Sequence, residues 1–117
     1  MELIMKMVIA FIKKNKFDEV MFALHKIEGL TGASSSEIHG FGCDRTRHVP
    51  EQEPEISLDF KPHITLEIAC HLELVDEVLS TIAKAVHTGL RGDGKIYVLP
   101  LEESLRIRTG ERSENAV

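Results

Sequence analysis

The segment from Gly89 to Lys95, GLRGDGK, carries residue types that suit the binding of an anion. Its three glycines permit positive φ angles and close backbone approach, so successive N–H groups can turn toward one point. Arg91 and Lys95 add positive charge beside them. This composition predicts a phosphate-binding loop, although an ordinary helix-to-strand connection with a glycine cap explains the same letters. The tripeptide 91–93 also matches a cell-adhesion motif, but the chain follows no signal-peptide layout.

A second group of cations lies near the C-terminus, in the sequence RIRTGER. If this stretch is a strand, Arg106 and Arg108 project to the same face because they are two residues apart. Two guanidinium groups on one face form a clamp for phosphate or carboxylate, since each offers a fork of donors and neither loses its charge. A charged edge strand that keeps the protein soluble is the alternative interpretation.

Histidine and cysteine are scattered along the chain rather than grouped. There is no HxH or HExxH spacing, and Cys43 and Cys70 form no CxxC pair, which favours a reduced, cytosolic protein without a metal site. A trimer axis could still gather three copies of one histidine, or of Cys43, around a transition metal. A metal-responsive trimer is therefore kept as an alternative. The six histidines are His25, His39, His48, His63, His71 and His87.

The bulk composition excludes several classes of function. The chain has 117 residues, 43% of them hydrophobic and 28% charged, as expected of one globular domain. A net charge of −5, the absence of Trp and 5% aromatic residues argue against binding of nucleic acid or of an anionic membrane. The longest early apolar run, Met7 to Ile12, is too short to span a bilayer. We expect no direct membrane insertion, so any membrane role would act through a partner protein.

Hydrophobic periodicity predicts six regular elements along the chain. Strands are indicated by β-branched, alternating runs, and helices by apolar residues at helical spacing followed by Gly29 or Gly89. The predicted order is strand 5–14, helix 15–29, strand 31–42, loop 43–57, strand 61–72, helix 73–89, strand 95–100 and a tail, 101–117, with a strand-like stretch at 105–109. This β-α-β, loop, β-α-β order predicts a ferredoxin-like α+β sandwich over residues 1–117, a fold that does not fix function.

Three stretches also resemble one known family. The sequence GDGKIYVLPLEESLRIRTGE is similar to the C-terminal signature of the PII signal-transduction proteins. EIHGFG resembles the segment that opens their long T-loop, and VIAFIKKNKFDEVMFAL resembles their first strand and helix. The resemblance covers almost the whole chain. It implies a compact homotrimer with nucleotide clefts between neighbouring subunits, where ATP or ADP sets the conformation of the T-loop that target proteins recognise.

The resemblance also implies the residues of the nucleotide site. One subunit would wrap the phosphates with its glycine loop, and its neighbour would reach them with an arginine pair. The GFG segment would line the cleft, and two further residues would face the base and ribose. The implied set is Gly40, Phe41, Gly42, Gly92, Asp93, Gly94, Lys95, Arg106, Arg108, Ser34 and Glu67.

Two departures from the family pattern concern its co-effectors. Asp44 replaces a family glutamine that helps bind Mg²⁺ and 2-oxoglutarate. A carboxylate could still ligate Mg²⁺, but it would repel a dicarboxylate. His63 replaces the lysine that pairs with 2-oxoglutarate, and imidazole is only partly charged at neutral pH. We therefore expect weak coupling, or none, to 2-oxoglutarate.

The T-loop itself, residues 43–57, is also altered. Ile56 and Pro54 stand where the family carries its modified tyrosine or serine, so the usual modification cannot occur there. The loop is basic first and then acidic, which suggests an unusual target protein, for example a membrane transporter. The residues expected to bind that partner are Arg45, Arg47, His48, Glu51 and Glu53.

An enzyme is the other alternative to a regulatory protein. The glycine loop and arginine pair could support weak nucleotide hydrolysis, but the sequence offers no nucleophile and no evident base beyond Glu67 and Asp93. The resemblance therefore implies a non-enzymatic sensor of ATP or ADP, with AMP as a further candidate ligand.

Overall fold

The computed structural model describes residues 4–39 and 62–117 of the chain. The predictions for Gly40, Phe41, Gly42, Cys43 and Asp44, and for the partner-binding residues of the T-loop, lie outside the described residues. The ends of the predicted strands 31–42 and 61–72 lie there in part as well.

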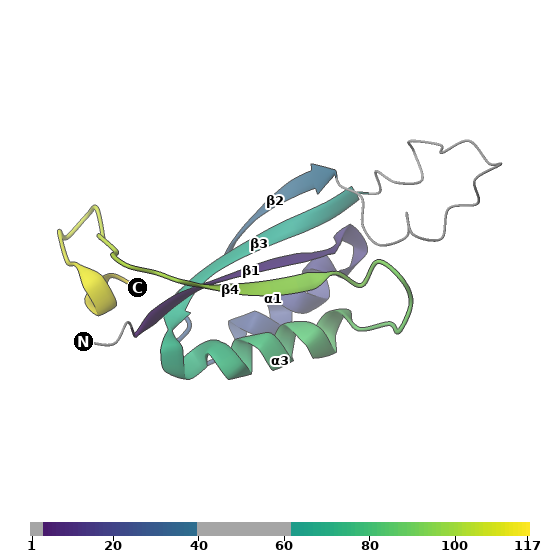
Figure 1. Ribbon diagram of the computed structural model, residues 1–117, viewed down its shortest axis with the longest axis horizontal. Coiled ribbons are helices and arrows are strands. Elements are labelled where there is room, and N and C mark those ends of the chain that lie inside the picture. The colour runs from purple at the N-terminus through teal and green to yellow at the C-terminus, as the bar shows by residue number, and fades with distance from the viewer. Residues whose placement is uncertain (1–3, 40–61) are drawn as a thin grey trace.

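Six elements occur in the predicted order (Figure 1). Each helix follows a short 3₁₀ turn and has two acidic residues in its first turn, which suits the helix dipole. Their bounds are β1 Met5–Lys13, α1 Phe17–His25, β2 Ser34–His39, β3 Pro62–His71, α3 Val75–Val86 and β4 Lys95–Pro100.

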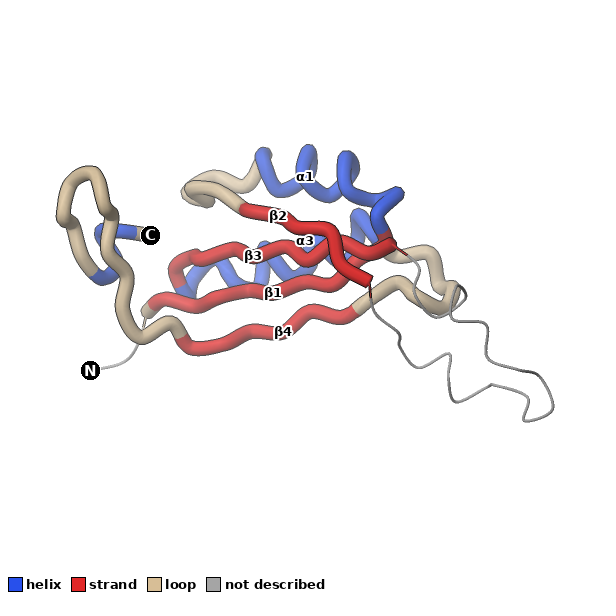
Figure 2. The backbone as a smooth tube through the Cα atoms, turned by 90° about the horizontal axis from the view of Figure 1, so that it is seen from above, coloured by secondary structure: helices blue, strands red, loops and turns tan. Residues whose placement is uncertain are grey.

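The strands form one four-stranded sheet in the order β2-β3-β1-β4, with every neighbouring pair antiparallel. Both helices lie on the same side of this sheet (Figures 1 and 2). This arrangement confirms the predicted ferredoxin-like α+β sandwich.

The core lies between the sheet and the two helices. Alternate residues of the central strands are buried because successive side chains of a strand point to opposite faces. The buried thiol of Cys70 belongs to this core, and burial raises its pKa, which keeps it in the unreactive form. The core side chains include Val8, Ala10, Ile12, Val20, Leu24, Ile64, Leu66, Ile68, Val78, Ile82 and Val86.

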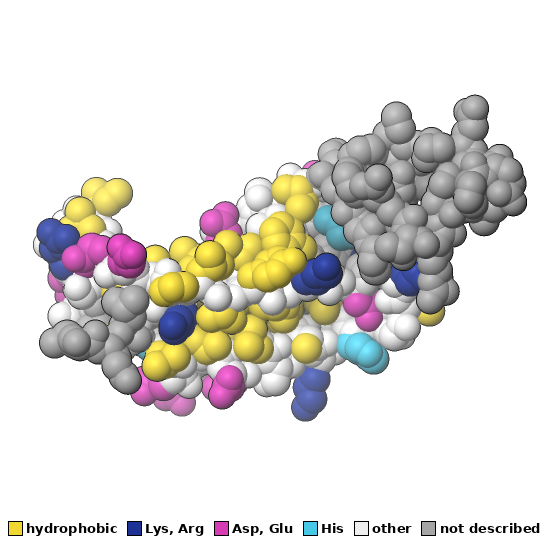
Figure 3. Space-filling view, in the orientation of Figure 1, with side chains coloured by type: hydrophobic (Ala, Val, Ile, Leu, Met, Phe, Trp, Pro, Cys, Tyr) yellow, Lys and Arg dark blue, Asp and Glu magenta, His cyan; other side chains and the backbone are white. Residues whose placement is uncertain are grey.

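The opposite face of the sheet is not covered by α1 or α3 (Figures 1 and 2). In the β1–β4 register Ile9 pairs with Tyr97 and Met7 with Leu99, so these apolar side chains share that face. The rings of Phe11 and Tyr97 meet edge to face, with centroids 5.9 Å apart. Tyr97 is 50% exposed, and Figure 3 shows apolar side chains gathered over the sheet. We call this surface the open face.

The strand predicted at 105–109 is absent, and this prediction was wrong. Leu105 forms only an isolated bridge with Arg112, and the chain between them reverses. Gly110, at φ +77°, donates its N–H to the carbonyl of Arg106 at 2.8 Å, and Glu111 accepts the Arg106 N–H at 2.8 Å. A glycine in the left-handed region therefore closes a turn where the alternating letters suggested a strand. The inference that Arg106 and Arg108 share one strand face fails with it.

Candidate functional site

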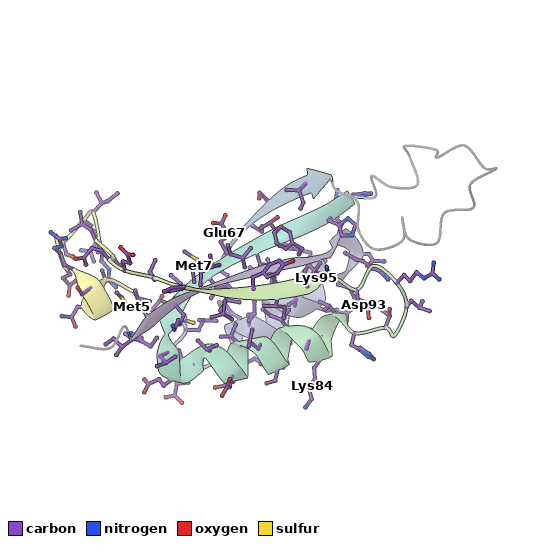
Figure 4. The ribbon with its side chains drawn as sticks, viewed as in Figure 1. Met5, Met7, Glu67, Lys84, Asp93 and Lys95 are labelled. Carbon is purple, nitrogen blue, oxygen red and sulfur yellow. The ribbon has the colours of Figure 1, made fainter. Side chains whose placement is uncertain are left out.

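The predicted site residues divide between the two ends of the molecule. The loop that connects α3 to β4 lies at one end, and the C-terminal segment 101–117 lies at the other (Figures 1 and 2). Asp93 and Lys95 belong to the loop end, whereas Glu67 is set back from both on β3 (Figure 4). Because β4 separates the loop from the C-terminal segment, one chain does not bring Lys95 and Arg108 together.

The glycine loop is held directly against β1. Gly92 and Gly94 have φ angles of +85° and +110°, which side chains other than glycine rarely adopt. A Cβ atom added to Gly94 would lie 1.7 Å from the carbonyl oxygen of Phe11, so the two backbones touch there. The loop thus needs glycine at position 94 for a close approach as well as for its turn.

The side chain of Asp93 turns back into its own loop. Its Oδ2 accepts the N–H groups of Thr88 at 2.9 Å and of Gly89 at 3.0 Å. Its Oδ1 accepts the Thr88 hydroxyl and lies 3.5 Å from Nζ of Lys13. The hydrogen bonds from Thr88, that from Gly89 and the Lys13 charge together hold the pKa of this carboxyl far below its usual range.

Lys13 also lies at the loop end of the molecule, where we did not predict it. It is the last residue of β1, and its Cε would lie 3.3 Å from a Cβ on Gly92, so its stem crosses the loop. Its ammonium group, which pairs with Asp93, adds a cation to the end of the molecule that also holds Arg91 and Lys95. Only the pairing of Phe11 with Lys95 in the sheet brings Lys13 there, so no local sequence signal marks it.

The C-terminal arginines lie on the turn described above. Arg106 is ion-paired with Glu111 at 3.2 Å, while Arg108 is exposed and forms no hydrogen bond or ion pair with the other described residues. The turn is tied to the preceding chain by Glu103, which accepts hydrogen bonds from Ser113 and lies 2.9 Å from Arg112. Hydrogen bonds from Ser104 and Ser113, with the charge of Arg112, lower the pKa of Glu103. Arg108 is therefore presented outward from an anchored turn.

The other predicted residues line a shallow hollow of about 300 Å³ beside this segment. Ser34 donates a long hydrogen bond, 3.5 Å, from its hydroxyl to the carbonyl of Glu67 across β2 and β3. The C-terminal segment contributes to the lining of the same hollow. The lining residues are Thr31, Gly32, Ala33, Ser34, Glu67, Ala69, Ser104, Ala116 and Val117. The structure thus groups Ser34 and Glu67 with the C-terminal segment and apart from the glycine loop.

A second open hollow, of about 460 Å³, lies between β2 and the start of α1 and contains none of the predicted site residues. Within residues 4–39 and 62–117, no three His, Cys, Asp or Glu side chains come close enough to hold a metal ion. Over the same residues, no helix is long and apolar enough to cross a membrane.

Comparison with known proteins identifies one family. A family model described as "Nitrogen regulatory protein P-II" matches residues 5–111. The P-II protein of Azospirillum brasilense is 41% identical over 113 residues, which is 97% of this chain and 100% of that protein. The corresponding protein of Rhodospirillum rubrum is 42% identical, and the nitrogen regulatory protein GlnK of Escherichia coli 38%, with the same coverage. A crystal structure of Arabidopsis thaliana PII bound to citrate superposes with a TM-score of 0.78 at 32% identity, covering 99% of this chain and 94% of that one.

Proposed function

Because this chain belongs to the nitrogen regulatory protein P-II family, we propose that it forms a homotrimer that binds ATP or ADP between its subunits and reports the nucleotide to a target protein. The family supports a regulatory signalling role. The nucleotide, the trimer and the target are the proposal, and AMP is a weaker candidate ligand.

The observation that carries this proposal is the separation of two half-sites in one chain. The glycine loop with Lys13 and Lys95 forms one half-site, and the C-terminal segment with Arg108, Ser34 and Glu67 forms the other. Neither half encloses a ligand by itself. A head-to-tail interface that closes into a ring would place the first half of one subunit against the second half of the next. Each cleft would then combine two subunits.

The donor types of the two half-sites suit a polyphosphate. The glycine loop offers backbone N–H groups and ammonium groups, and the C-terminal turn offers guanidinium groups. Such donors form charge-assisted hydrogen bonds to phosphate oxygens. The hollow beside Ser34 and Glu67 leaves room for a base or ribose in contact with both polar and apolar atoms.

The signal would pass through the T-loop, residues 43–57. ATP and ADP would stabilise different conformations of this loop, because only a difference in affinity between conformations can shift their balance. A target protein, for example a membrane transporter, would bind one of them. The carboxylate of Asp44 can ligate Mg²⁺, so we propose Mg²⁺ as a co-ligand. Because Asp44 and His63 replace the family glutamine and lysine that bind 2-oxoglutarate, we expect 2-oxoglutarate to couple weakly.

Calorimetric titration tests the nucleotide site. We expect micromolar binding of ATP and ADP, measured with and without Mg²⁺, 2-oxoglutarate and bicarbonate. Changing both Arg106 and Arg108 to Ala should weaken binding of ATP by at least tenfold, because a charge-assisted hydrogen bond contributes about 1.5–3 kcal/mol. The control is Lys84→Ala, which removes an exposed cation on α3 that points away from the sheet (Figure 4) and should change the affinity less than about threefold. Absence of heat with every nucleotide would contradict the proposal.

The open face provides a separate test of the trimer. Ile9→Glu places a carboxylate in the middle of this apolar face, directly opposite Glu67 in the β1–β3 register. We expect it to convert a species of three times the 13.1 kDa chain mass into smaller ones, as measured by light scattering after gel filtration. Phe22→Glu is the matched control, because Phe22 is already 66% exposed on α1. Equal masses for wild type and Ile9→Glu would show that this face is not an interface.

A further inference from the structure

The contacts around Thr88 occupy three consecutive backbone amides, those of residues 88–90, at the start of the glycine loop. The N–H groups of Thr88 and Gly89 donate to Asp93, as described above. The N–H of Leu90 donates to the Thr88 hydroxyl oxygen at 3.1 Å, and that hydroxyl donates in turn to Asp93. The amides of residues 88–90 are therefore already hydrogen-bonded within the protein and are not available to a ligand. The N–H of Gly92, in contrast, has no partner among the described residues.

We propose that Thr88 and Asp93 form a clasp that positions the second half of the loop, from Gly92 onward, for a phosphate group, and that the Asp93 carboxylate does not itself contact phosphate. The proposal rests on the nucleotide site proposed above. It assigns Asp93 and Thr88 as positioning residues, in place of the expected direct contact of Asp93 with the ligand.

The physical reason is the conformational freedom of this segment. Three glycines in six residues make an unrestrained loop that would lose much entropy when it orders around a ligand. The clasp holds both ends of the turn before a ligand arrives: Thr88 and Gly89 follow α3, and Asp93 precedes β4. A loop that is already shaped loses less entropy on binding, so its affinity is higher.

Lys13 completes the arrangement from β1. Its ammonium group lies 3.5 Å from Asp93, and its stem packs beside Gly92. The negative charge of Asp93 is thus turned inward and balanced by a cation. A carboxylate that pointed out of this loop would instead repel the phosphates.

Removal of the Asp93 charge should change the affinity for ATP in opposite directions under two interpretations of this residue. If Asp93 only places a negative charge near the phosphates, Asp93→Asn should tighten ATP binding. If Asp93 holds the clasp, Asp93→Asn should weaken binding at least tenfold, because the amide cannot accept all three hydrogen bonds. We expect weakening, equal with and without Mg²⁺. Weakening only with Mg²⁺ would indicate a metal ligand and would overturn the proposal.

Thr88 provides the matched pair of variants. Thr88→Val keeps the shape and removes the hydroxyl, and we expect about tenfold weaker ATP binding by calorimetry. Thr88→Ser keeps the hydroxyl and should bind within about twofold of wild type. The proposal would be overturned if Thr88→Val bound ATP as tightly as wild type. It would also be overturned if Thr88→Ser lost as much affinity for ATP as Thr88→Val.

Amide hydrogen exchange without ligand separates failure of the clasp from failure of the proposed function. The N–H groups of Thr88 and Gly89 should exchange more slowly in wild type than in Asp93→Asn, whereas the N–H of Gly92 should exchange rapidly in both. Fast exchange at Thr88 and Gly89 in wild type would overturn the clasp even if ATP binds. A protein that shows the slow exchange but binds no nucleotide would instead overturn the nucleotide site, and with it the positioning role.

Discussion

Gly94→Ala should lower the midpoint of thermal unfolding by more than about 10 °C, from a change of one methyl group. The φ angle of +110° costs a residue with a Cβ about 1–2 kcal/mol. The new atom would also lie 1.7 Å from the carbonyl oxygen of Phe11, so β1 and β4 must move apart. A loss of more than about 3 kcal/mol in the free energy of unfolding corresponds to this shift, because 1 kcal/mol moves the midpoint by about 4 °C in a domain of roughly this size. Circular dichroism would measure it.

Two other glycines provide matched controls for this effect. Gly110 has a φ angle of +77° but no atom within 4 Å of an added Cβ, so Gly110→Ala should cost only about 1 kcal/mol. Gly32 also has open space and no positive φ, so Gly32→Ala should change stability by less than about 0.5 kcal/mol. A Gly94→Ala midpoint as high as that of Gly110→Ala would show that the close approach to Phe11 is not required.

Mixing two inactive variants should restore nucleotide binding. Lys95→Glu damages the glycine-loop half-site, and the double change of Arg106 and Arg108 to Ala damages the C-terminal half-site. Neither variant alone should bind ATP well. If each cleft combines two neighbours, every mixed trimer contains one cleft with both halves intact. Unfolding and refolding the variants together at equal amounts should therefore restore about one quarter of the clefts.

The number of ATP molecules bound per chain measures this recovery. A site built within one chain would give none, because every chain in the mixture carries one damaged half. The control is to refold each variant separately and then combine the samples, so that subunits do not exchange before the titration. Recovery in that control, or no recovery after joint refolding of a mixture that does form trimers, would contradict the proposed interface.

The elements and their order could be predicted from sequence because their signals are local. The alternation of Val8, Ala10 and Ile12 indicates a strand with one buried face, and the structure buries all three. The spacing of Val78, Ile82 and Val86 likewise indicates a helix, and these residues are buried in α3. Each of these patterns depends on a period of two or 3.6 residues. The family resemblance, which the comparisons confirm, rested on equally local motifs.

The tail shows where a local pattern is ambiguous. The letters LRIRT alternate like a strand, but Gly110 and the pairing of Arg106 with Glu111 turn the chain instead. Gly110 favours a turn and the alternating residues favour a strand, but the sequence alone did not show which of the two would form. That outcome depends on Glu103, which anchors the returning chain at Ser113.

The sequence by itself determined the fold, the family and the two groups of residues suited to phosphate. Only the tertiary structure decided how those groups are placed. It put the glycine loop and the C-terminal arginines at opposite ends of β4, turned Asp93 inward toward Thr88, and brought Lys13 beside Gly92. The last of these features depends on the pairing of β1 with β4, which joins residues more than 80 positions apart. No local period encodes such a contact, since it exists only once the sheet has formed.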